Sequence, residues 1–285
     1  MTSCITFPRP ARAAALLLVA SALALPGAAS AQTTTYVSGQ VVDAATGAQD
    51  LDALLGAASL ATRSSLPGAS AAASVDVMGG AAHLYAATSG ATQSATASAA
   101  FGYDVTLTNR GGPATVAPMQ LFLDGIFRQT IPGSTDGQPY ANVIGRAWDR
   151  SSGQLVSSVD LWLFGDATAA TPATQHAWDA LVLPRPATVG GATTFRIDWS
   201  YTVAADAGWE ADFQNTARIF FPTVDGITWS ADAGLLGQQA RPAWAKDQRV
   251  DYEIDATTTT PEPATLALFG GGLLALAAVA RRRRA

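Results

Sequence analysis

The side chains that could carry out covalent chemistry are few and widely separated in this 285-residue chain. It has two histidines, His83 and His176, and a single cysteine, Cys4. A nucleophilic triad needs a histidine placed against a serine and a carboxylate, but no serine stands in a Gly-x-Ser-x-Gly turn. One cysteine can form neither an internal disulfide nor a cysteine-based zinc cluster. We therefore expect no enzyme activity; a hydrolase built on two facing carboxylates is the less favoured alternative.

Tryptophans beside charged or loop residues are the candidates for ligand binding. An exposed indole next to a carboxylate can stack on a sugar ring while the carboxylate bonds the sugar hydroxyls, whereas half-buried packing under loops is the structural alternative. Trp162 and Trp199 fall in apolar strands and are expected in the core. The four candidate sugar-stacking residues are Trp148, Trp178, Trp209 and Trp244.

An acidic group is the one candidate for a metal site. Asp206, Glu210 and Asp212 surround Gly208, and carboxylate oxygens suit Ca²⁺. The spacing lacks the Asp-x-Asp-x-Asp-Gly pattern of a calcium loop, which favours a solvated acidic loop. We expect no cofactor, with Ca²⁺ as the weak exception.

The first 31 residues are typical of a secretory signal peptide. Two arginines precede an apolar run over residues 13–25, and small residues follow it. That run of 13 residues is short for a membrane span of about 20, so we expect it to be cleaved rather than to anchor the chain. The residues that define the expected cleavage site are Ala29, Ala31 and Gln32.

The C-terminus has three parts in a fixed order. A threonine spacer with a Pro-Glu-Pro motif (256–263) precedes an uncharged apolar stretch (264–280) and a basic tail (281–285). As a helix the apolar stretch is about 25 Å long, just enough for a thin bilayer. Arginines would hold the tail in the cytoplasm and leave the body outside. The motif residues and the basic cluster are Pro261, Glu262, Pro263, Arg281, Arg282, Arg283 and Arg284.

This C-terminus resembles a PEP-CTERM sorting domain. The resemblance implies an exosortase, a membrane-embedded transpeptidase-like enzyme of Gram-negative bacteria that make exopolysaccharide, as the processing partner. It implies cleavage near Pro261-Glu262-Pro263, loss of the transiently anchoring helix, and release or attachment outside the cell. A permanent membrane anchor is the alternative.

The charge of the mature segment restricts its partners. Residues 32–255 hold 11 basic and 21 acidic side chains, so their net charge is −10. An acidic surface repels phosphate backbones, which excludes nucleic acid as a favoured partner. Extracellular polysaccharide remains a candidate partner.

Period-two alternation predicts an all-β ectodomain. Apolar and polar residues alternate over 95–107, 195–203 and 250–254, and residues 159–164 are apolar enough to be buried on both faces. Asp124-Gly125 and Asp225-Gly226 predict tight hairpins, and one helix is expected over 50–61. These elements favour an antiparallel, jelly-roll-like β-sandwich over residues 32–255.

Together these features predict a non-enzymatic, exported protein of the cell surface or extracellular matrix, associated with exopolysaccharide or biofilm. A carbohydrate-binding sandwich, assisted by Ca²⁺, is the alternative.

Overall fold

The computed structural model describes residues 35–56, 59–77, 80–134, 137–166, 172–231 and 243–245. All of them fall within one compact unit. The expected signal peptide, the strand at 250–254, the Pro-Glu-Pro motif and the apolar stretch at 264–280 lie outside these ranges. No helix among the described residues is long and apolar enough to cross a membrane.

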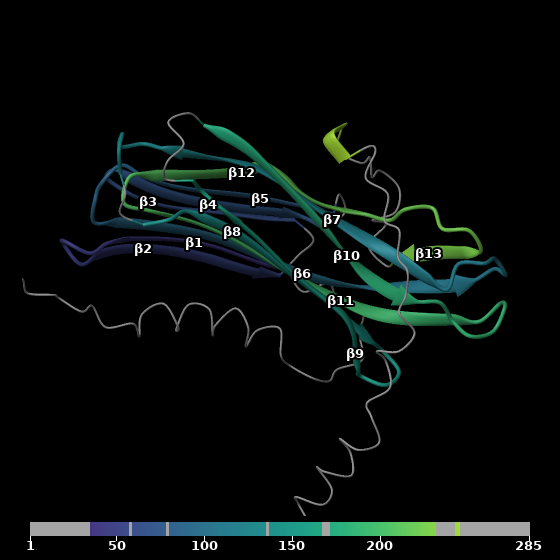
Figure 1. The fold of residues 1–285 in the computed structure, drawn as a ribbon. Coiled ribbons are helices and arrows are strands. Elements are labelled where there is room, and N and C mark those ends of the chain that lie inside the picture. Colours follow the sequence, from purple (N-terminus) through teal and green to yellow (C-terminus); the bar gives the residue numbers. More distant parts are fainter. Residues whose placement is uncertain are drawn as a thin grey trace, which may run out of the picture. The chain divides into compact units, whose positions relative to one another are not determined.

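The described chain folds into two antiparallel sheets that pack face to face (Figure 1). The seven-stranded sheet has the order β2-β1-β6-β11-β8-β9, and β13 pairs with the C-terminal part of β6. The six-stranded sheet has the order β10-β7-β12-β5-β4-β3. The predicted all-β antiparallel sandwich is confirmed.

The strands of the seven-stranded sheet are β1 (Thr35–Asp43), β2 (Ala48–Gly56), β6 (Gln93–Asn109), β8 (Tyr140–Asp149), β9 (Leu155–Phe164), β11 (Ala192–Asp206) and β13 (Ile227–Ala231). Those of the six-stranded sheet are β3 (Ser59–Leu66), β4 (Ala69–Asp76), β5 (Ala81–Thr88), β7 (Val116–Gln129), β10 (Ala173–Pro184) and β12 (Trp209–Phe220).

The inner faces of β6 and β11 form an aromatic core. The Phe101 ring stacks on Tyr103 at 6.0 Å and on Tyr201 at 5.8 Å between ring centroids. The indole Nε1–H of Trp199 donates to the Tyr103 hydroxyl at 3.0 Å. Gly145 of β8 provides the space for this indole, since a Cβ there would lie 2.2 Å from Trp199 Cζ3. The alternation predicted for β6 and β11 is therefore confirmed, as is the core position of Trp199.

At the other end the core is built from small residues, and the two sheets approach closely. Ala71, Ala73 and Ala97 are buried there. A Cβ on Gly39 of β1 would lie 3.1 Å from the backbone oxygen of Ala71 in the opposite sheet. The hydroxyl of Ser64 donates to the Gly39 carbonyl oxygen at 2.7 Å. Because these side chains are small, the two sheets can pack close together without leaving a gap between them.

Polar side chains connect the two sheets at both open edges of the sandwich. The Asp50 carboxylate on β2 accepts from the backbone N–H of Ser65 on β3 at 2.7 Å. At the opposite edge the Ser157 hydroxyl on β9 accepts from the N–H of Val182 on β10 at 2.9 Å. These bonds satisfy backbone groups that an edge strand would otherwise offer to another chain.

The helix expected over 50–61 is wrong. Residues 48–56 form β2, which pairs along its whole length with β1, and β3 begins at Ser59. The leucine spacing that favoured a helix instead leaves Leu51 and Leu55 exposed on one face of this edge strand. Pairing with β1 outweighs the weak local helix preference.

The hairpin expected at Asp124-Gly125 is also wrong. β7 continues through both residues, because β10 and β12 pair with it on either side. Gly125 is needed for packing rather than for a turn, since a Cβ there would lie 2.3 Å from the Phe213 ring. Asp225-Gly226 does form a turn, with Gly226 at φ 74°, but the strands before and after it, β12 and β13, belong to different sheets.

The expectation that residues 159–164 are buried on both faces is wrong. β9 is the edge strand of its sheet, with Val159 inside and Trp162 and Phe164 outside. Trp162 is 46% exposed and Phe164 is 47% exposed. The core position expected for Trp162 is therefore also wrong, because β9 turns only the face that carries Val159 toward the other sheet, and Trp162 lies on the opposite face.

Candidate functional site

The four candidate sugar-stacking tryptophans do not gather at one place. Trp209 is only 2% exposed and lies in the core, so it offers no ring face to a ligand. Trp148 is half-buried on the outer face of the seven-stranded sheet, in register with Arg196. Trp178 and Trp244 belong to the other side of the sandwich and are half-buried as well.

Trp244 covers part of the outer face of the six-stranded sheet. It lies in η2 (Ala243–Ala245) and contacts the Phe122 ring edge-on at 5.6 Å. It also stacks on the His176 imidazole, with 4.6 Å between ring centroids. Phe122, whose strand neighbour on β10 is Trp178, is fully buried although it points away from the core. Trp244 therefore packs as a cover over an apolar patch.

An imidazole–carboxylate pair lies beside Trp244. His176 Nδ1 is 2.9 Å from Asp124 Oδ1, and the two residues are directly opposite each other on β10 and β7. Such a pair can orient an imidazole for proton transfer. Among the described residues, the side-chain contacts of His176 are this carboxylate and the Trp244 ring, not a serine or threonine hydroxyl. The other histidine, His83, is bonded through Nδ1 to the carbonyl oxygen of Gln214.

The three candidate Ca²⁺ ligands do not converge. Asp206 ends β11 in one sheet, whereas Glu210 and Asp212 lie on β12 in the other. Glu210 forms an ion pair with Arg128 at 3.0 Å. Among the described residues, no three histidine, cysteine, aspartate or glutamate side chains are grouped so that they could hold a metal ion. The structure thus does not group these three acids as one set of ligands.

These carboxylates nevertheless influence a neighbouring phenol. Tyr85 on β5 lies directly across from Asp212. Partial burial raises the pKa of Tyr85, and the negative charges of Glu210 and Asp212 raise it further. The two acids on β12 thus help to keep the neighbouring Tyr85 hydroxyl protonated.

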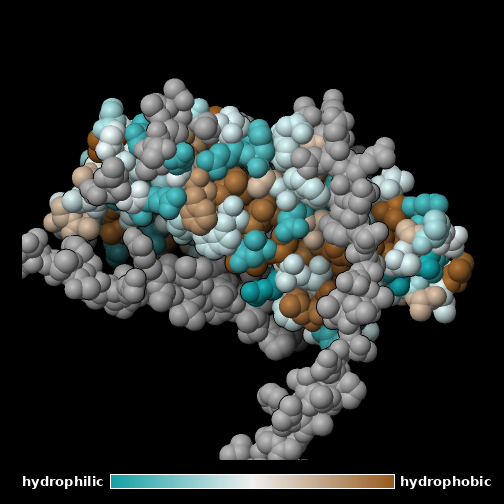
Figure 2. Space-filling view, viewed as in Figure 1, coloured by the Kyte–Doolittle hydropathy of each residue, from teal (hydrophilic) through white to brown (hydrophobic). Residues whose placement is uncertain are grey.

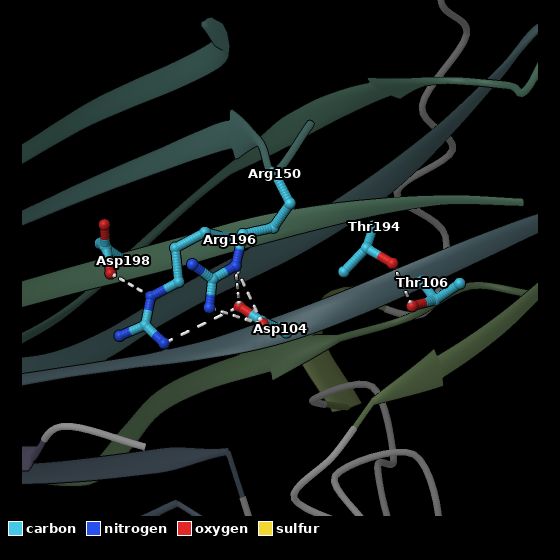
Figure 3. Close-up of polar contacts among 6 residues, drawn as sticks. All are labelled: Asp104, Thr106, Arg150, Thr194, Arg196 and Asp198. Carbon is cyan, nitrogen blue, oxygen red and sulfur yellow. Dashed lines mark hydrogen bonds and ion pairs between the residues drawn. The ribbon is translucent and has the colours of Figure 1, made fainter. Parts of the chain in front are cut away.

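A paired charge network joins Asp104 on β6, Arg196 and Asp198 on β11, and Arg150 just after β8, on the outer face of the seven-stranded sheet (Figure 3). Asp104 accepts from Arg150 through both of its carboxylate oxygens, at 2.9–3.2 Å. Arg196 lies 3.8 Å from the same carboxylate and donates to Asp198 at 2.9 Å. Gly102 leaves room for this guanidinium, since a Cβ there would lie 2.2 Å from Arg196 Nη2. With both arginines engaged by carboxylates, this region does not present a bare cationic site for an anion.

An exposed aromatic group lies at the edge of the same face. We call Tyr140 on β8 together with Trp162 and Phe164 on β9 the aromatic strip. The Trp162 and Phe164 rings are parallel within 7°, with centroids 5.7 Å apart. The Tyr140 ring is 5.5 Å from Trp162 and tilted by 45°. The sequence alone did not reveal this strip, because Trp162 and Phe164 belong to an apolar run that is typical of a buried strand.

Polar groups stand directly beside the aromatic strip. Asn142 is the register neighbour of Trp162, and Asp160 is two residues before it on the same face. The Asn142 side-chain amide donates to Asp160 Oδ1 at 2.8 Å and to the Leu161 carbonyl at 3.2 Å. Asp160 itself is exposed. In the space-filling view, apolar and hydrophilic residues are likewise interspersed over the visible side of the molecule (Figure 2).

Comparison with known families identifies the C-terminal segment. The PEP-CTERM protein-sorting motif matches residues 259–284. The chain carries a PEP-CTERM sorting motif. The match includes the Pro-Glu-Pro residues and the arginine cluster, and it confirms the resemblance seen in the sequence. No curated protein and no solved structure matches the chain.

The PEP-CTERM motif indicates an exported protein that is sorted to the cell envelope or surface. It also implies processing by an exosortase. The motif therefore determines the destination of the sandwich, while the described side chains determine what the sandwich can contact there.

Proposed function

We propose that this protein is a non-enzymatic component of the extracellular polysaccharide layer, or biofilm matrix, of a Gram-negative bacterium. The observation that carries the proposal is the PEP-CTERM motif at the end of a chain whose body is an all-β sandwich. In this account the signal peptide exports the chain and the apolar stretch at 264–280 holds it at the membrane. Cleavage near Pro261-Glu262-Pro263 then separates the sandwich from this membrane segment outside the cell.

The side chains best suited to catalysis support a structural role. His176 and Asp124 pair with each other, and the Trp244 ring stacks on the partly exposed imidazole. Asp104 and Glu210 are both engaged by arginines. Hydrolysis would require two facing carboxylates, or a serine against a histidine, in a cleft that admits substrate. The contacts of these four residues instead favour a body that is stabilised for display.

The chemistry of the sorting segment explains why it suits a processing enzyme. The prolines at 261 and 263 cannot continue a helix, so they favour an extended backbone just before the apolar stretch. Proteolytic enzymes can reach an extended segment more readily than a folded one. Cleavage there would remove the apolar segment and leave an acidic, soluble product.

The test measures both location and mass in the producing bacterium. Deletion of 264–285 should prevent surface retention, and Glu262→Gln should slow processing because it removes the motif's charge. Glu253→Gln, a substitution of the same kind outside the matched segment, is the control. The intact mass of the wild-type, cell-associated protein should fit a chain that begins at Gln32 and ends near Pro263.

Two results would overturn the proposal. A mature protein that still carries Arg284, or that accumulates in the cytosol, would refute sorting and processing. Release of reducing sugars from the bacterium's own polysaccharide by the purified protein, and loss of that activity in His176→Ala or in any carboxylate variant, would refute the non-enzymatic assignment.

A further inference from the structure

We propose that the aromatic strip, together with Asn142 and Asp160, binds pyranose rings of an extracellular polysaccharide. The inference deepens the proposed function and rests on it, because export gives this face access to polysaccharide. It names a surface that differs from the four tryptophans expected from the sequence.

The placement of the rings is the first observation. Trp162 and Phe164 alternate with inward residues on β9, so both side chains leave the same face of the sheet. Both are nearly half exposed, and their planes are parallel within 7°. The two rings stack on each other, so together they form one aromatic ridge along the strand that an extended polymer can contact. Tyr140 on the neighbouring strand supports the indole from the side at 5.5 Å.

The polar neighbours are the second observation. A sugar ring has an apolar face of C–H groups and a rim of hydroxyls, so its site needs aromatic surface and a few placed acceptors and donors. Asp160 offers an exposed carboxylate on the same strand face as Trp162. The bond from Asn142 to Asp160 Oδ1, at 2.8 Å, holds that carboxylate in one position. A preorganised acceptor beside an aromatic ring reduces the entropy lost on binding.

The size and charge of the patch favour a sugar over other occupants. Aromatic side chains bury roughly 150–250 Å² each when fully covered, so three partly exposed rings offer at most about 300 Å² of apolar surface. A stable protein interface needs about 800 Å² from each partner. An anionic membrane surface recruits clusters of lysine and arginine, whereas the charged group beside Trp162 on β9 is the carboxylate of Asp160.

The experiment measures polysaccharide binding by the processed protein as the cells export it. The probes are the extracellular polysaccharide purified from the producing cells and cellohexaose as a defined neutral chain. We expect Trp162→Ala and Phe164→Ala each to weaken binding at least about tenfold, as truncation of a central aromatic contact does. Leu155→Ala is the matched control, because Leu155 lies on the same strand and is also 47% exposed. It should change the affinity by less than about twofold.

A second measurement avoids truncating an aromatic side chain to alanine. Polysaccharide should protect the wild-type protein from quenching of tryptophan fluorescence by acrylamide. Trp162→Phe, which keeps an aromatic ring, should abolish most of that protection while the unfolding midpoint stays unchanged.

The outcomes separate this inference from the proposed function. Failure of the wild type to bind either probe, or equal binding by Trp162→Ala and the wild type, would overturn the aromatic strip as a sugar site. Either result leaves sorting and display intact, because those are judged by location and intact mass. Binding of the purified polysaccharide without cellohexaose would support the site and restrict it to the bacterium's own polymer.

Discussion

Tyr103 and Tyr201 lie in the same aromatic core, but their hydroxyl groups differ in hydrogen bonding. Both rings are fully buried and stack on Phe101. The Tyr103 hydroxyl accepts from Trp199 Nε1 at 3.0 Å and faces the Met119 sulfur at 3.7 Å. The Tyr201 hydroxyl is buried, and it has no hydrogen-bond partner among the described residues. The same Tyr→Phe substitution should therefore change stability in different directions at the two positions.

The magnitude follows from what each substitution leaves behind. Tyr103→Phe removes the acceptor of the Trp199 indole and leaves a buried N–H unsatisfied, which costs about 1–3 kcal/mol. The Tyr201 hydroxyl lost its hydration on burial without gaining a hydrogen bond. Tyr201→Phe removes that cost, so it should be neutral or should stabilise the fold by up to about 1 kcal/mol. In a domain of this size each kcal/mol corresponds to roughly 2–4 °C in the unfolding midpoint.

The assay is thermal and urea unfolding of the two variants beside the wild type, followed by tryptophan fluorescence and far-UV circular dichroism. We expect the midpoint of Tyr103→Phe to fall by about 2–12 °C, the range that 1–3 kcal/mol implies at 2–4 °C for each kcal/mol. The midpoint of Tyr201→Phe should stay the same or rise. Equal destabilisation by both variants would refute the reasoning, because it would mean that both hydroxyls are equally satisfied in the native state.

Three further outcomes are expected. Burial raises the pKa of Tyr103, and burial together with Tyr103 raises that of Tyr201. The unfolded chain releases these protons near pH 10, so the stabilisation from the two neutral hydroxyls should be fully present below about pH 10 and should be lost above it. The loss should be less steep in Tyr201→Phe, and unfolding midpoints measured against pH would show this. Gly145→Ala would place a methyl group 2.2 Å from the Trp199 ring and should lower the unfolding free energy by about 1–3 kcal/mol in urea titrations. Asp104→Asn removes the negative charge that both Arg150 and Arg196 approach. It should lower the unfolding free energy by about 1 kcal/mol, and 1 M salt should reduce this effect.

Local pattern predicted the strands that have one buried face. Alternation over 95–107 and 195–203 matched β6 and β11, because the side-chain period of a strand is two and each of these strands packs one face on the other sheet. The same reasoning failed at 50–61 and at Asp124-Gly125. In both places pairing with a neighbouring strand, which is distant in sequence, overrode a local signal.

The candidate binding residues divide in a similar way. Neighbouring charges suggested Trp209, but the fold buries its ring, while the exposed Trp162 looked like a core residue. Exposure of an aromatic side chain depends on which face of the sheet it occupies and on what covers that face. Trp209 packs in the core between the two sheets, whereas Trp162 points outward from β9, and adjacent residues do not encode which face packs against the other sheet.

The sequence by itself determined where the protein goes and that its body is β-structured. The machinery that exports and processes a chain recognises short contiguous segments, so residues 259–284 carry their meaning without the fold. Only the tertiary structure decided that β9 is an edge strand, that Asn142 lies beside Asp160, and that the candidate calcium ligands are split between two sheets. These facts arise from contacts between strands far apart in the chain, and such contacts exist only once the two sheets have paired and packed.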